Sequence, residues 1–81
     1  MKFDTIIIGA GSAGMQVATA LQASGRKTAV IGLGRSINEV DVHPYERLGG
    51  TLLIGDAVRE GIFEDSRLRA VHTVNLGGYP L

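Results

Sequence analysis

Residues 6–14 are the most informative part of this 81-residue chain, with the sequence Ile6-Ile7-Ile8-Gly9-Ala10-Gly11-Ser12-Ala13-Gly14. Its three isoleucines form an apolar run typical of a buried parallel strand, and the spacing Gly-x-Gly-x-x-Gly follows at once. In that pattern Gly9 permits a sharp turn, Gly11 lets a ligand approach the backbone, and Gly14 lets the next helix pack closely on the sheet. The free N–H groups of that helix would then hold a phosphate, which the helix dipole also favours.

The residues after the glycine turn predict a helix and a second strand. Apolar residues recur at helical spacing between Ala13 and Ser24, and Gly25 stands where a left-handed residue commonly ends a helix. Thr28 to Ile31 form an apolar run typical of a second buried strand. Strand, turn, helix and strand together make a βαβ unit of about 30 residues. The helix face predicted to be buried consists of Ala13, Val17, Ala20 and Leu21.

Composition narrows the class of protein. Eight Lys and Arg residues balance eight Asp and Glu residues, so the formal net charge is zero and neither nucleic acid nor anionic lipid is indicated as a partner. The chain has no cysteine, which excludes disulfides, thiolate metal sites and cysteine nucleophiles and is compatible with a reducing cytosol. No signal peptide is evident, and no run approaches the roughly 20 apolar residues of a transmembrane segment.

The rest of the chain divides into a connection and a β-rich segment. The connection spans residues 35–50, and its first part, residues 35–43, has no clear period. Within the connection Ser36-x-x-Glu39 fits a capping box, and Pro44 suits the first turn of a short helix that Gly49-Gly50 would end. After this connection, strands are expected over 51–54, 58–63 and 68–74, with a further one from Tyr79. Gly77-Gly78 is expected to form a tight hairpin turn with positive φ.

We therefore expect a single small α/β domain over residues 1–81, a truncated Rossmann-like unit. The βαβ unit occupies 1–34, the connection 35–50, and a third parallel strand with a C-terminal β-meander 51–81. The doubly wound pattern predicts the strand order 3-2-1. A chain of this size buries only about 60–65% of its unfolded surface, and exposed sheet edges would favour a homodimer.

The candidate ligand site is the glycine turn. The residues expected to bind a phosphate are Gly9, Gly11, Ser12, Ala13 and Gly14. The Ser12 hydroxyl could bond a phosphate oxygen, or it could cap the helix. No catalytic residue and no metal site is predicted.

Other notable side chains are expected to be structural. His72 should be half-buried on a strand, and His43 should be solvated without a carboxylate partner. Asp56 should serve a turn or strand end, and Met15 should fill a gap in the core. A further set of cations should form ordinary charged surface: Arg35, Arg47, Arg59, Arg67 and Arg69.

The longer spacing Gly9-x-Gly11-x-x-Gly14-x-x-x-Ala18-x-x-Leu21-x-x-x-Gly25 resembles the N-terminal fingerprint of two-dinucleotide-binding flavoproteins. Two further stretches resemble one family in particular. They are Leu48-Gly49-Gly50-Thr51-Leu52-Leu53-Ile54-Gly55-Asp56-Ala57-Val58 and Arg67-Leu68-Arg69-Ala70-Val71-His72-Thr73-Val74-Asn75-Leu76-Gly77. That family is the FMN-associated flavoprotein subunit of the anaerobic glycerol-3-phosphate dehydrogenase. The resemblance covers about residues 1–36 and 47–81 and lacks the family's long middle region, so we expect a shortened form.

This resemblance implies a flavin-dependent oxidation of sn-glycerol 3-phosphate to dihydroxyacetone phosphate. Electrons would pass through other dehydrogenase subunits to membrane quinone, which implies a cytoplasmic protein held at the periphery of the inner membrane by those subunits. The implied cofactor is FMN or FAD. Gly32 stands where the FAD fingerprint has a carboxylate for the adenosine ribose, which favours FMN unless Glu39 or Asp41 substitutes. The short chain by itself is expected to be inactive as an enzyme.

Two other functions stay open. The chain could be a structural or dimerisation module that keeps the Rossmann-like fold without binding flavin. It could also be the NAD-binding domain of a dehydrogenase, which Gly32 and the flavoprotein-like spacing of Ala18, Leu21 and Gly25 disfavour.

Overall fold

The computed structural model describes residues 2–33, 40–75 and 77–81. The predicted capping box at 36–39 and Arg35 lie outside this part of the chain. In the described part no helix is long and apolar enough to cross a bilayer. The elements follow in the order β1 (Thr5–Ile8), α1 (Ser12–Ala23), β2 (Thr28–Gly32), α2 (His43–Arg47), β3 (Thr51–Ile54), β4 (Val58–Glu64), β5 (Arg67–Thr73) and β6 (Gly78–Pro80).

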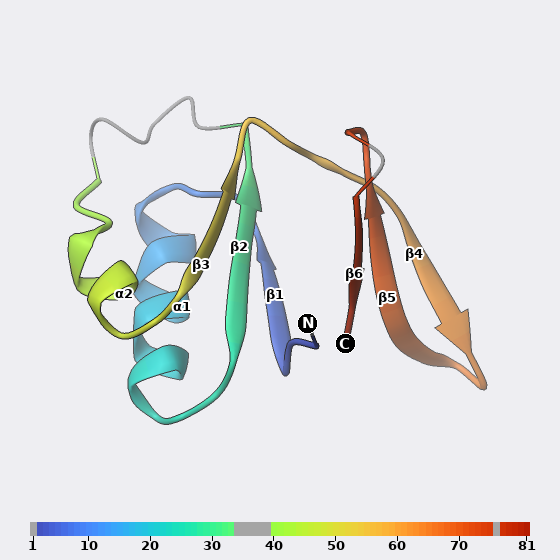
Figure 1. Ribbon diagram of the computed structural model, residues 1–81, viewed down its shortest axis with the longest axis horizontal. Helices are drawn as coiled ribbons and strands as arrows, with labels where there is room; N and C mark the ends of the chain where they lie inside the picture. Colours follow the sequence, from blue (N-terminus) through green and yellow to red (C-terminus); the bar gives the residue numbers. More distant parts are fainter. Residues whose placement is uncertain (1, 34–39, 76) are drawn as a thin grey trace.

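The first sheet is parallel and has β2 at its centre. Its strand order is β1-β2-β3, which confirms the predicted order and the third parallel strand. Ile7 lies opposite Val30 and Val30 opposite Leu52. Every residue of β2 is buried because the strand has a neighbour on each side and other elements cover both faces of the sheet. Figure 1 shows the helices on one face and the strands β4 to β6 on the other.

The second sheet is the expected β-meander, an antiparallel three-stranded sheet in the order β4-β5-β6. Asp65 and Ser66 turn the chain between β4 and β5 with positive φ angles of 52° and 65°. The prediction that Gly78 belongs to a hairpin turn is wrong, because Gly78 pairs with His72 inside β6 and the turn lies earlier. The amide of Phe3 donates to the carbonyl of Pro80 at 3.0 Å, which ties the N-terminal segment to the meander.

Helix α1 forms where the apolar spacing predicts it, but it buries a different face. Met15 and Ala18 are buried, whereas Val17 is 54% exposed. The rotation is set at Gly14, where an added Cβ would collide with the carbonyl oxygen of Gly9 and lie 3.3 Å from Ile7 Cγ2. This close contact turns the Met15–Ala18 side toward the sheet. The predicted C-terminal glycine is confirmed, since Gly25 has a φ of +93°.

Tyr45 from α2 completes the core beneath α1, together with Met15, Ala18 and Val30. Its fully buried hydroxyl lies 2.8 Å from Thr28 Oγ1 and accepts the Thr51 amide at 3.2 Å. A Cβ on Gly50 would collide with the Tyr45 ring, so the chain passes directly over the ring before β3. These contacts fasten the short helix predicted from Pro44 to the starts of β2 and β3.

Candidate functional site

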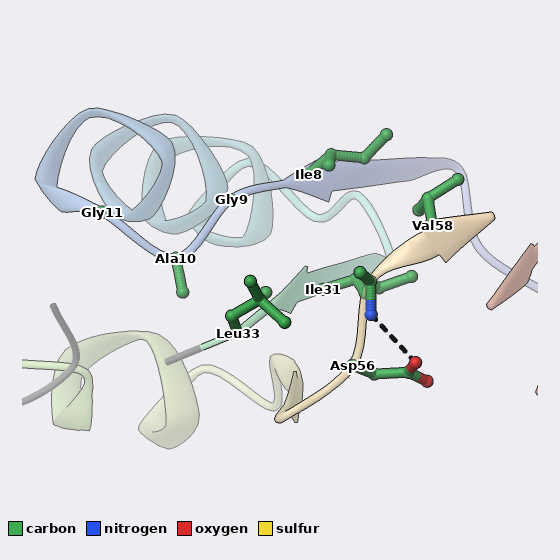
Figure 2. A pocket seen from close by; sticks show the side chains of 10 residues that line it. Ile8, Gly9, Ala10, Gly11, Ile31, Leu33, Asp56 and Val58 are labelled. Atoms are coloured by element: carbon green, nitrogen blue, oxygen red, sulfur yellow. Dashed lines mark hydrogen bonds between the residues drawn. The ribbon is translucent and has the colours of Figure 1, made fainter. Parts of the chain in front are cut away.

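An open cavity of about 350 Å³ lies at the carboxyl ends of β1, β2 and β3. Parallel α/β sheets bind ligands in the crevice at this edge. Among the residues that the structure describes, Asp56 is the only charged residue in its lining. Figure 2 shows the cavity, which is lined by Ile8, Gly9, Ala10, Gly11, Ile31, Gly32, Leu33, Asp56, Ala57 and Val58.

Gly9 makes the turn out of β1 as predicted. Its φ is +108°, a conformation that residues with a side chain rarely adopt. Its amide donates to the carbonyl of Ile31 at 2.7 Å, so the turn begins while the chain is still bonded to β2. The glycine at this position is therefore required by the backbone itself.

Gly11 is required neither by its backbone nor by packing. Its φ of −75° and ψ of 178° are extended angles that any residue adopts. A Cβ added at Gly11 would have no heavy atom within 4 Å, and the residue lines the cavity. Gly11 thus leaves the backbone bare on the side where a ligand would approach.

The first turn of α1 presents amides to solvent beside Gly11. Gly11 is the N-cap residue and offers no side-chain hydrogen bond, and the first helical bond runs from the Met15 amide to the Gly11 carbonyl at 2.9 Å. Helix geometry leaves the preceding amides of Ser12, Ala13 and Gly14 without partners in the helix. No acidic side chain lies in this turn, so it can accept an anion.

The predicted site residues do not all reach the cavity. Gly9 and Gly11 line it, while Gly14 packs behind the turn against Gly9. Ser12 and Ala13 are exposed, and Ser12 lines a separate groove on the α2 side of the helix. Because Gly11 is the N-cap, the alternative that Ser12 caps the helix is wrong and its hydroxyl is left for other partners.

The end of β2 closes tightly against the glycine turn. A Cβ on Gly32 would lie 2.9 Å from the Ala10 nitrogen and 3.1 Å from Ala10 Cβ. The Gly32 carbonyl accepts the amides of Gly55 at 2.8 Å and Asp56 at 3.2 Å. The FAD fingerprint has a carboxylate where this chain has Gly32. Asp41 does not replace it, because Asp41 lines the separate groove on the α2 side of α1. Glu39 lies outside the described residues.

Asp56 follows the carboxyl end of β3 and joins the cavity there, a placement that sequence reasoning missed. Its side chain is buried, and Oδ1 accepts the amides of Ala57 at 2.9 Å and Asn75 at 3.2 Å. A hydrogen bond from the Thr73 hydroxyl, assisted by these amides and opposed by burial, holds the pKa of Asp56 below its usual range. The expected strand-end role is confirmed. Its position after the third parallel strand was the signal that could have placed it here.

Neither histidine reaches the cavity. His43 is solvated as expected, but the prediction that it has no carboxylate partner is wrong, since its Nδ1 lies 3.0 Å from Asp41 Oδ1. The His43 backbone amide is the largest cause that lowers the pKa of Asp41. His72 is half-buried as predicted, 3.3 Å from Glu60 Oε1. In the described ranges no three His, Asp or Glu residues are grouped to hold a metal ion.

Comparisons with known proteins agree with this architecture. A family model described as pyridine nucleotide-disulphide oxidoreductase matches residues 3–76. The crystal structure of the ferredoxin reductase for the CYP199A2 system from Rhodopseudomonas palustris is similar in fold, with a TM-score of 0.80 at 23% sequence identity. The similarity covers 93% of this chain and 21% of that chain, so this chain spans about a fifth of the reductase. No curated protein matches the chain.

Proposed function

The chain belongs to the pyridine nucleotide-disulphide oxidoreductase family, and from that premise we propose that it is a flavin-binding module of an oxidoreductase. The observation that carries the proposal is Gly11, a glycine that neither φ nor packing requires and that opens onto the cavity. A ligand that needs bare backbone at this point explains its presence. The adjacent amides of the first turn of α1 supply the anion-binding partner that such a ligand needs.

Each part of the site has a distinct role in this proposal. The Gly11 backbone and the amides of Ser12, Ala13 and Gly14 hold the phosphate, and the exposed Ser12 hydroxyl adds a hydrogen bond. The apolar residues Ile8 and Val58 offer contact to the rest of the ligand at the cavity mouth. A bound flavin supplies the redox chemistry, while the protein supplies binding and orientation.

Of the two flavins, the end of β2 favours FMN over FAD. FAD needs a partner for its adenosine ribose, commonly a carboxylate at the end of the second strand. Gly32 has no side chain, and its close approach to Ala10 leaves no room for one. FMN has no adenosine ribose and does not lose this contact.

The reaction we propose for the larger enzyme comes from the resemblance to the flavoprotein subunit of the anaerobic glycerol-3-phosphate dehydrogenase. Its substrate would be sn-glycerol 3-phosphate, and other subunits would carry electrons onward. We expect the present chain alone to show no turnover of sn-glycerol 3-phosphate with an artificial electron acceptor. Turnover by the chain alone would contradict this assignment of roles.

A flavin titration of the purified chain tests the binding proposal. We expect saturable binding of FMN with a rise in melting temperature, because a ligand that binds only the folded state stabilises it by about 2.7 kcal/mol at one hundred times Kd. Gly11→Val should abolish binding and lower the melting temperature of the free protein only slightly, because its Cβ meets no heavy atom within 4 Å and the remaining cost is that of a poorer N-cap residue. Gly78→Ala is the matched control, since its Cβ would make only ordinary contacts with His72, at 3.6 Å or more. A folded sample without saturable binding of FMN or FAD would overturn the proposal.

A second candidate function is a dimerisation module. The observation that favours it is β1, which among the described residues pairs with β2 alone, carries no charged residue and leaves Ile8 66% exposed. Such an edge is a template for pairing with another strand. A stable dimer that is indifferent to flavin would favour this function over the first.

A further inference from the structure

We propose that the β-meander binds a phosphate group, as inorganic phosphate or as part of a small phosphate monoester, in a hollow between Arg59 and His72. The hollow has a volume of about 240 Å³ and is lined by Arg59, His72, Gly77 and Gly78. It shares no lining residue with the cavity at the glycine turn. The inference therefore does not rest on flavin binding.

The hollow lies on the face of the meander that is turned away from the parallel sheet. Val71 and Thr73 of β5 are buried, and successive side chains of a strand point to opposite faces. His72, which lies between them in the sequence, therefore points outward. The start of β4, the end of β5 and the start of β6 meet at the end of the molecule where β2 and β3 also finish (Figure 1).

A β-bulge in β4 places Arg59 beside His72. Val58 pairs with Thr73 and Glu60 pairs with His72, so Arg59 is an extra residue in β4. Regular strand geometry would point Arg59 and Glu60 to opposite faces, whereas a bulge redirects a side chain. Arg59 Nη2 and His72 Nδ1 both lie 3.3 Å from the same atom, Glu60 Oε1. The bulge thus brings two basic side chains together on the outward face.

Gly78 keeps the space beside the imidazole of His72 open. The Thr73 amide donates to the Gly77 carbonyl at 2.9 Å, so the next pair along the ladder, His72 and Gly78, is a non-hydrogen-bonded pair, in which facing residues lie closest. A Cβ at Gly78 would make only ordinary contacts, 3.6 Å from His72 Cδ2 and 3.9 Å from Nε2, and its φ is outside the left-handed region. Neither backbone nor packing requires this glycine, and a ligand beside Nε2 explains it.

The hydrogen-bond donors at the hollow are only partly used. Among the described residues the Arg59 guanidinium makes one hydrogen bond, from Nη2 to Glu60, and arginine has five N–H donors. His72 uses Nδ1 toward Glu60, and a protonated imidazole donates from Nε2 as well. Both side chains are partly exposed, so a ligand can reach these donors from solvent.

Charge and size select the ligand. Arg59 and a protonated His72 carry two positive charges against one negative charge on Glu60, which contacts both bases but does not line the hollow. A phosphate offers several acceptor oxygens and suits the planar guanidinium. The hollow is smaller than the roughly 300–1,000 Å³ typical of sites for whole organic ligands. It therefore fits a single phosphate group and not a complete flavin or nucleotide.

The ring signals of the two histidines in proton NMR test the proposal. The chain has two histidines, and His43 contacts Asp41 instead, so His43 is an internal reference. At mildly acid pH, where histidine gains a proton, inorganic phosphate should shift the His72 signals saturably and leave those of His43 in place. We expect the same from sn-glycerol 3-phosphate and no shift from chloride at equal ionic strength and pH.

Three results of this titration would overturn the proposal. The first is a His72 signal that stays in place, and the second is a parallel movement of the His72 and His43 signals. The third is a response to sn-glycerol 3-phosphate without any response to inorganic phosphate, because the phosphate group alone would then not be what the hollow recognises.

Substitutions at the hollow should change the affinity for inorganic phosphate in opposite directions. Arg59→Gln should weaken it by roughly tenfold or more, the loss expected for a charge-assisted hydrogen bond, and Gly78→Val should abolish binding by filling the hollow. Glu60→Gln should tighten binding, since it removes the competing carboxylate. Arg67→Gln is the matched control, because Arg67 is an exposed arginine at the other end of β5. Circular dichroism verifies the fold of each variant. Equal losses in Arg59→Gln and Arg67→Gln would overturn the proposal.

Gly11→Val separates this hollow from the anion site at the first turn of α1. The variant should lose flavin binding and keep the full response of His72 to inorganic phosphate. Arg59→Gln should do the reverse. Loss of the His72 response in a folded Gly11→Val variant would place the phosphate at the glycine turn and overturn the proposal for the meander.

Discussion

The amide of Gly9 donates to the carbonyl of Ile31 across a distance of 2.7 Å. This bond holds the first residue of the glycine turn against the end of β2, so the turn projects over the end of the central strand. The cavity exists because the chain leaves β1 at this point and does not return to the sheet until after α1. The positions of Gly11, Gly14 and Gly32 near this cavity differ in what surrounds them, so substitutions at these positions should have different effects.

Gly14→Ala should destabilise the fold, whether or not ligand is present. Its Cβ would collide with the Gly9 carbonyl, and overpacking of this kind costs about 1–3 kcal/mol. Urea denaturation followed by circular dichroism measures the loss. Gly11→Ala is the comparison, since its Cβ meets no atom within 4 Å; equal stability of the two variants would refute this distinction between the glycines.

Ser12→Ala should weaken flavin binding without affecting stability. The hydroxyl is exposed, and Gly11 rather than Ser12 is the N-cap. Loss of one hydrogen bond to a phosphate corresponds to about 1.5–3 kcal/mol, or roughly a tenfold to hundredfold increase in Kd. Fluorescence titration measures it, with Ser24→Ala at the other end of α1 as control. An unchanged Kd would remove Ser12 from the site.

Gly32→Glu should not create an FAD site. The new side chain would start 2.9 Å from the Ala10 nitrogen, so the glycine turn must move to admit it, and FMN affinity should fall together with the melting temperature. Parallel titrations with FMN and FAD check this. A variant that binds FAD more tightly than the wild-type chain does would show that the turn yields readily and that Gly32 alone excludes FAD.

Tyr45→Phe should lower the free energy of unfolding by about 1–3 kcal/mol, the cost of leaving a buried polar group unsatisfied. The change removes the hydroxyl bonded to Thr28 and Thr51 and leaves the buried Thr28 hydroxyl with fewer partners. Thermal and urea unfolding measure the effect. Tyr79→Phe, at a half-buried tyrosine of β6, serves as control, and equal losses in both variants would contradict a specific role for the Tyr45 hydroxyl.

Protonation of the Asp56 carboxylate should lower the free energy of unfolding at acid pH. Its folded pKa lies below the usual value of 3.8 because the Thr73 hydroxyl and two backbone amides stabilise the carboxylate. The unfolded chain therefore binds the proton first as pH falls, so this contribution is complete above pH 3.8 and is lost as pH drops through the lower folded pKa. Melting temperatures from pH 7 downward should decline less steeply at the acid end in Asp56→Asn. Parallel curves for both proteins would count against this linkage.

Much of the fold and the centre of the site followed from local patterns in the sequence. The Ile6–Ile8 run, the glycine spacing and Gly25 act within a few residues of each other, so strand, turn, helix and second strand were predictable. The right-handed crossover then implied the order of the parallel strands. Gly9 and Gly11 were identified for the same reason, since turn geometry and ligand access are properties of the local backbone.

Other features of the fold and the candidate site depend on contacts between distant segments, which local sequence patterns do not specify. The rotation of α1, which buries Met15 rather than Val17, is set by Gly14 meeting Gly9 and Ile7, and helical spacing admits either face. Asp56 and Val58 reach the cavity only because β3 lies beside β2. The 66% exposure of Ile8, at the end of an apolar strand, likewise follows from packing, since exposure belongs to the packed molecule and not to any one stretch of sequence.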